Sequence, residues 1–104
     1  MRRPAIFFGH GSPMNALGGP FATEWQRLGT ALGKPKGVVM VSAHWETAEL
    51  AVTGEAQPRT IHDFGGFPAE LHAMQYPAPG SPELAARVAA LTGATPTDQW
   101  GLDH

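Results

Sequence analysis

Apolar residues recur at helical spacing in the first third of this chain. Within residues 20–32 they fall three or four positions apart, at Phe21, Trp25, Leu28 and Leu32. That spacing places them on one face of a helix, and the following Gly33 and Pro35 supply a stop signal. We therefore expect an amphipathic helix over residues 20–32.

A second helix is predicted from residue 82 to about residue 91. Ser81 is a suitable N-cap, Pro82 suits the first helical position, and Glu83 suits the positive end of the helix dipole. Gly93 is the expected C-cap. The residues expected to face inward are Leu84, Val88 and Leu91.

Two continuous apolar runs predict buried strands. Residues 4–8 are bounded by charge and by Gly9, and residues 37–43 are apolar without alternation, which is typical of a strand covered on both faces. With the helix between them, these runs would form a right-handed βαβ unit. The predicted fold class is α/β, with a mixed or parallel sheet and helices on both faces.

The second half of the chain predicts shorter elements. Residues 50–53 indicate a third strand. Residues 57–80 are rich in proline, glycine and aromatic side chains, which favours an ordered irregular segment with one helical turn near residues 69–74. Residues 94–104 should contain a short strand or turn.

Length and charge narrow the class of protein. With 104 residues the chain is the size of one domain, and we treat residues 1–104 as a single unit. Seven scattered Lys and Arg against nine Asp and Glu give a formal charge of -2, which argues against a nucleic-acid partner. The first apolar run is too short for a signal peptide or a membrane span, so we expect a cytoplasmic protein without a membrane partner.

Two histidines stand where the apolar runs end, because His10 follows residues 4–8 and His44 follows residues 37–43. If both runs are neighbouring parallel strands, both imidazoles project into the crevice at the carboxyl ends of the strands, where open α/β sheets bind ligands. The chain has no cysteine, so a metal must be held by histidine and carboxylate groups. Imidazole suits iron, zinc, copper and nickel, and two imidazoles with one more ligand leave positions open for substrate.

The third ligand stays open on the residues alone. The candidates are the carboxylates and imidazoles of Glu46, Asp63, Asp103, His62, His72 and His104. Glu46 either shares a face with His44 or is a solvated charge at a strand edge. His62 and Asp63 lie in a glycine-rich aromatic loop that either closes over a pocket or is stabilised by its own side-chain hydrogen bonds. His72 is typical of a surface or packing residue.

Five short motifs resemble one known family. They are GHGSPM at residues 9–14, SAHWET at 42–47, HDFGGFP at 62–68, YPAPG at 76–80 and WGLDH at 100–104. In this order and spacing they resemble the 4,5-DOPA extradiol dioxygenases of the class III, LigB-type, superfamily of ring-cleaving enzymes. The motifs spread over nearly the whole chain, so a chance match is very improbable.

The resemblance implies roles for three histidines. It implies that His10 and His44 bind the metal, which is Fe(II) for ring cleavage or Zn(II), and that His104 lines the active site and contacts substrate. The implied substrates are a catechol such as DOPA and O2. Chains of this family are much longer, with a further ligand and an acid–base histidine in their C-terminal part. We therefore expect the N-terminal part of a dioxygenase domain, inactive by itself.

Two alternatives use the same residues differently. A zinc-dependent hydrolase could use the His10 and His44 pair with Asp63 or Glu46 as the third ligand and a metal-bound hydroxide as nucleophile. A non-catalytic remnant would contribute only a folded surface. In all three cases an incomplete α/β sheet exposes strand edges and an apolar face, so we also expect self-association or poor solubility.

Overall fold

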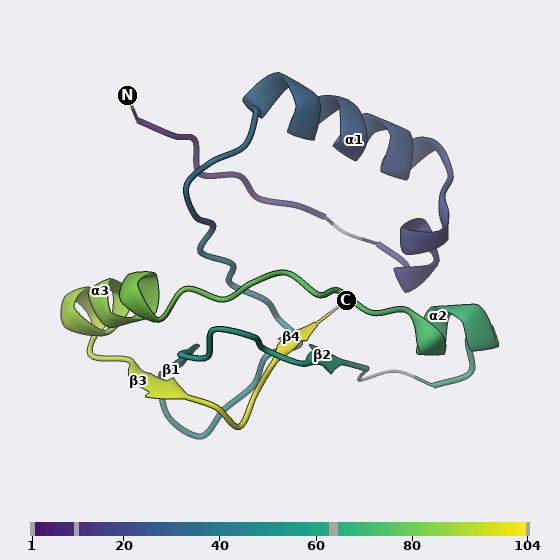
Figure 1. Cartoon of the computed structure of the whole chain (residues 1–104). Helices are drawn as coiled ribbons and strands as arrows, with labels where there is room; N and C mark the ends of the chain where they lie inside the picture. Colours follow the sequence, from purple (N-terminus) through teal and green to yellow (C-terminus); the bar gives the residue numbers. More distant parts are fainter. Residues whose placement is uncertain (1, 10, 63–64, 104) are drawn as a thin grey trace.

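A computed structural model describes residues 2–9, 11–62 and 65–103 of the chain (Figure 1). Its helical elements are a 3-10 helix η1 (Pro13–Leu17) and the α-helices α1 (Pro20–Leu32), α2 (Ala69–Ala73) and α3 (Pro82–Thr92). Its strands are β1 (Ala51–Thr53), β2 (Thr60–Ile61), β3 (Thr95–Thr97) and β4 (Leu102–Asp103). Helices combined with small parallel sheets confirm the α/β class.

Both long helices begin and end where their capping residues predict. α1 starts at Pro20, and the amide of Gly33 closes it by donating to the Gly29 carbonyl at 3.1 Å. At the start of α3 the Ser81 hydroxyl accepts a hydrogen bond from the Leu84 amide at 3.1 Å, and Gly93 ends the helix with a φ of 79°. Only glycine adopts that left-handed conformation without strain, which explains why the helix stops there.

The face that α3 buries agrees with the prediction at Leu84 and Val88, which are half-buried, and differs from it at the end of the helix. Leu91 was expected to point inward but is 81% exposed, whereas Ala85 is buried. α3 packs on β1 and β3, and each of these strands has three residues. Strands of that length reach about 10 Å, while a helix of 11 residues is about 16 Å long. The last turn of α3 therefore extends beyond the surface that would cover Leu91.

Four strands pair in two parallel sheets. β1 pairs with β3, with Ala51 opposite Thr95, and β2 pairs with β4, with Thr60 opposite Leu102 and Ile61 opposite Asp103. Each pair joins segments more than 40 residues apart, because α2 and α3 lie between the partners in sequence. The strand predicted at residues 50–53, the helical turn near 69–74 and the short strand after residue 94 are all confirmed.

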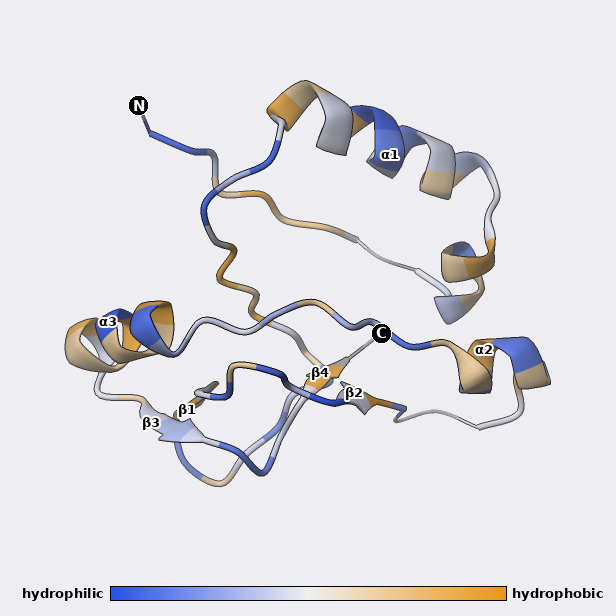
Figure 2. Ribbon diagram, viewed as in Figure 1, coloured by the Kyte–Doolittle hydropathy of each residue, from blue (hydrophilic) through white to orange (hydrophobic). Residues whose placement is uncertain are grey.

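The predicted βαβ unit around α1 is wrong. Residues 4–8 and 37–43 run as irregular chain, and neither run is a strand. Phe7 is 96% exposed and Val41 is 92% exposed. A strand requires a neighbouring backbone to complete its hydrogen bonds, and neither run pairs with another strand among the described residues. Figure 2 shows both runs as orange, hydrophobic stretches outside the paired strands.

The buried core lies entirely in the second half of the chain. The buried apolar residues of the described part are Leu71, Ala85 and Ala94, and Leu71 is fully buried. None of the described helices is both long and apolar enough to cross a membrane. This core belongs to α2, to α3 and to the residue before β3, and α3 packs on the sheet of β1 and β3.

Candidate functional site

The candidate site lies where three segments meet, and β2 and β4 provide its base. These parallel strands end side by side at Ile61 and Asp103. Each is followed in the sequence by a histidine, His62 after β2 and His104 after β4. The carboxyl ends of parallel strands are where α/β sheets bind ligands. The predicted strands before His10 and His44 are not formed, and the adjacent parallel strands that histidines follow in the sequence are β2 and β4.

The strand pair is held together by backbone contacts at its start. The Leu102 amide donates to the Arg59 carbonyl at 2.8 Å, and the Arg59 guanidinium donates to the Gln99 carbonyl at 2.6 Å. Gly101 is buried between them, and a Cβ at this position would overlap the Arg59 carbonyl oxygen. Two backbones thus approach so closely that the position accepts only glycine.

The third segment is the turn at residues 42–45, which carries His44. The Ser42 hydroxyl accepts a hydrogen bond from the His44 amide at 3.2 Å, and the Ser42 carbonyl accepts one from the Trp45 amide at 3.3 Å. The Trp45 indole Nε1 donates to the Gly101 carbonyl at 2.8 Å. The turn is thereby joined to the segment that leads into β4, while the His44 side chain is exposed.

His62 is held by its own loop. Its ring Nε2 donates to the Met74 carbonyl at 2.6 Å, and the neighbouring Tyr76 amide donates to the Thr60 hydroxyl at 2.8 Å. Both contacts use the same face of β2, because side chains two residues apart in a strand share a face. The interpretation of this loop as stabilised by side-chain hydrogen bonds is therefore confirmed for His62.

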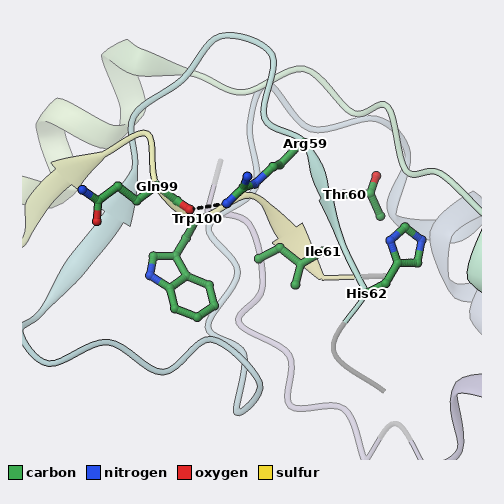
Figure 3. A pocket seen from close by; sticks show the side chains of 6 residues that line it. All are labelled: Arg59, Thr60, Ile61, His62, Gln99 and Trp100. Carbon is green, nitrogen blue, oxygen red and sulfur yellow. Dashed lines mark hydrogen bonds between the residues drawn. The ribbon is translucent and has the colours of Figure 1, made fainter. Parts of the chain in front are cut away.

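An open pocket of about 350 Å³ lies against the two strands. Its lining residues are Arg59, Thr60, Ile61, His62, Gln99 and Trp100. In Figure 3, Arg59 reaches towards Gln99, and Ile61 points towards Trp100, whereas Thr60 and His62 point the other way. On the side of Arg59 and Ile61 the pocket combines a guanidinium with the aromatic wall of Trp100, and such a lining suits an aromatic ligand that carries negative charge.

The remaining candidate metal ligands and substrate contacts fall into two groups, those that the structure describes and those that lie outside the described residues. Glu46 is exposed next to the turn, and His72 is exposed on α2. His10, Asp63 and His104 lie outside the described residues. Among residues 2–9, 11–62 and 65–103 no group of three or more histidine or acidic residues is arranged to hold a metal ion. The assignments of His10, His44 and His104, and the choice of third ligand, stay predictions.

Comparison with known proteins decides the family. A family described as the catalytic LigB subunit of aromatic ring-opening dioxygenase matches residues 10–100. The chain belongs to the LigB family. The resemblance carried by the five motifs is thus confirmed, and the family's enzymes are dioxygenases by that description.

Three relatives of this LigB chain carry the same name. The chain is 51% identical over 108 residues to the 4,5-DOPA dioxygenase extradiol of Escherichia coli, which covers 99% of this chain and 40% of the relative. It is 40% identical over 113 residues to the protein of the same name from Beta vulgaris, and this match covers 98% of the chain and 42% of the relative. The protein of that name from Portulaca grandiflora is 36% identical, with 98% and 41% covered. The chain therefore spans about two fifths of the length of these relatives.

One contact of the candidate site was not predicted from the sequence, the hydrogen bond from the Trp45 indole to the Gly101 carbonyl. Both residues lie in motifs that the family resemblance uses, SAHWET and WGLDH. No periodicity or spacing connects a residue to a partner 56 positions away. The only available signal is the presence of tryptophan and glycine, residues suited to a side-chain donor and a close backbone approach, in two motifs of one family.

Proposed function

We propose that this chain supplies part of the active site of a metal-dependent extradiol dioxygenase that opens the ring of a catechol such as DOPA with O2. Family membership and the names of the relatives support the reaction class. The observation that carries the proposal is the Trp45 hydrogen bond, which joins the His44 turn to the segment that leads into β4, the strand paired with β2.

In this proposal His10 and His44 are metal ligands. The donor chemistry fits Fe(II) or Zn(II), because the chain offers imidazole and carboxylate groups and no thiolate. The His44 side chain is exposed and therefore accessible to an ion. The metal would supply positions at which catechol and O2 react side by side. Further ligands are expected from the three fifths of the relatives' length that this chain does not match.

Three other residues act on the substrate in this proposal. His104 contacts the catechol and moves a proton at an imidazole nitrogen, which is the chemistry that histidine performs near neutral pH. The Trp100 ring forms the apolar wall of the pocket, and the Arg59 guanidinium carries positive charge at its edge. A catecholic amino acid has an aromatic ring and a carboxylate, so both groups match its chemistry.

Metal binding by the chain tests the ligand assignment. Zn²⁺ is titrated into the 104-residue protein while the histidine ring signals are followed by NMR. We expect the His44 ring signal to shift, and the His44→Ala variant to lose most of the affinity. His72→Ala is the matched control, because His72 is also exposed but lies on α2. Equal affinity in the His44→Ala variant and the wild type would contradict the assignment.

Activity is tested in a chimera that joins this chain to the unmatched part of the Escherichia coli relative. We expect uptake of O2 with DOPA and a yellow muconic semialdehyde product, both abolished by His44→Ala and retained by His72→Ala. Turnover that continues without O2 would instead favour the zinc hydrolase. A chimera that binds metal and turns over no catechol would overturn the dioxygenase assignment for this chain.

A further inference from the structure

We propose that Trp45 is a positioning residue that fixes His44 relative to the segment leading to His104. This inference rests on the proposed function, which makes both histidines parts of one site. The connection is a single directed contact, the hydrogen bond from the Trp45 indole Nε1 to the Gly101 carbonyl at 2.8 Å.

The acceptor makes this contact specific. It is a backbone carbonyl, so it cannot rotate away as a side-chain acceptor could, and the indole N–H is a donor only. Gly101 is itself fixed, because its backbone is pressed against Arg59 and the next amide, that of Leu102, donates to Arg59 at 2.8 Å. The hydrogen bond from Trp45 therefore holds the turn at residues 42–45 in a fixed place relative to β4.

The donor end is fixed as well. Ser42 closes the turn by accepting two hydrogen bonds. Its hydroxyl accepts one from the His44 amide, and its carbonyl accepts one from the Trp45 amide. Movement of the Trp45 backbone would therefore move His44 with it. The Trp45 hydrogen bond therefore joins the ordered turn at residues 42–45 to the ordered backbone at Gly101 and fixes the distance between them.

Exposure within the turn supports the same division of roles. Trp45 is half-buried, while its neighbours His44 and Glu46 are exposed. The tryptophan ring anchors the turn and leaves the adjacent imidazole accessible to an ion. Trp100 packs on Trp45 with a centroid distance of 5.9 Å and an interplanar angle of 52°. Two packed rings can slide past each other, so this contact adds packing but does not fix the orientation of Trp45 as the hydrogen bond does.

The first test uses the metal-free 104-residue chain and amide hydrogen exchange. We expect Trp45→Phe to speed exchange at the Trp45 and Leu102 amides at least about 5-fold, the loss that removal of one buried hydrogen bond produces. The Gly54 amide, bonded to Thr97 in the other sheet at 2.9 Å, should keep its rate. Trp100→Phe is the matched control, since it retains a ring and leaves the Trp45 donor in place.

A variant of Trp45 that keeps the shape of the side chain separates loss of the hydrogen bond from misfolding. Trp45→3-benzothienylalanine preserves the bicyclic ring and removes only the N–H donor, so packing is retained. It should reproduce the local increase in exchange. Equal exchange in this variant and the wild type, or an increase that extends to Gly54, overturns the inference, because the role of Trp45 would then be packing alone.

The second test adds Zn²⁺ and reads the histidine ring signals. We expect Trp45→Phe and the benzothienyl variant to weaken binding about 10-fold, in the range seen when a group that orients a metal ligand is removed, and Trp100→Phe to weaken it less. Unchanged Zn²⁺ affinity in both Trp45 variants overturns the positioning role. If the wild type binds no Zn²⁺, the proposed function loses its metal site, and the exchange experiment still decides whether Trp45 holds the turn.

Discussion

The two halves of the molecule obtain their order from different sources. In residues 2–43 no described residue is buried, and order comes from α1, from a few contacts to it, and from the packing of η1 on α2. Arg3 donates to the Leu32 carbonyl at 2.7 Å, and the Phe8 and Trp25 rings meet edge to face at 6.1 Å. In residues 44–103, by contrast, four strands pair into two parallel sheets (Figure 1), and the three buried apolar residues of the described part all lie in this region.

This difference separates local from non-local causes of structure. A helix closes its hydrogen bonds within a dozen residues, so caps and apolar spacing suffice to define α1 even where little covers it. A strand, by contrast, needs a second strand beside it to complete its backbone hydrogen bonds. The apolar runs at 4–8 and 37–43 have the composition of strands and remain unpaired, whereas the much less apolar residues 60–61 pair because β4 lies beside them.

Removal of the largest buried side chain should have the strongest effect on the second half. We expect Leu71→Ala to lower the free energy of unfolding by about 2–4 kcal/mol, because Leu71 is fully buried and its loss leaves a cavity. The same change at Leu91, which is 81% exposed, should cost less than about 0.5 kcal/mol. Urea denaturation followed by circular dichroism measures both. Equal losses would show that the described core is not the stabilising one.

Disturbing the base of the candidate site should have an intermediate effect. In Gly101→Ala the new methyl group overlaps the Arg59 carbonyl, so β2 and β4 must separate, at a cost of about 1–3 kcal/mol. Gly65→Ala is the control, because a Cβ there meets nothing within 4 Å. Exchange of the Leu102 amide measures the pairing directly. An unchanged rate in Gly101→Ala would mean that the close approach does not limit this position.

The smallest effect on stability is expected in the first half. Val41→Asp should change the free energy of unfolding by less than about 0.5 kcal/mol, since Val41 is 92% exposed. The same change should lower concentration-dependent self-association, because it places a charge in an exposed apolar run. Sedimentation velocity at two protein concentrations measures this. Strong destabilisation by Val41→Asp would show that residues 37–43 are packed and would erase the contrast between the halves.

The sequence predicted the elements that depend on local signals. Ser81 and Gly93 located α3, Gly33 located the end of α1, and the five motifs located the family. It could not identify which apolar runs would pair, because pairing depends on a partner strand and not on the run itself. For the same reason it placed His44 after a strand that does not form and missed the contact of Trp45, whose partner lies 56 residues away.

Gly101 has a further consequence for how β4 aligns on β2. Side chains alternate across a strand, so a slip of β4 by one residue would move its side chains from one face of the β2–β4 pair to the other. Any such slip would bring a residue with a Cβ, Trp100 or Leu102, to the position where the backbones nearly touch. The missing side chain at Gly101 thus selects one alignment out of several by excluding its neighbours, and with it the set of groups that faces the pocket.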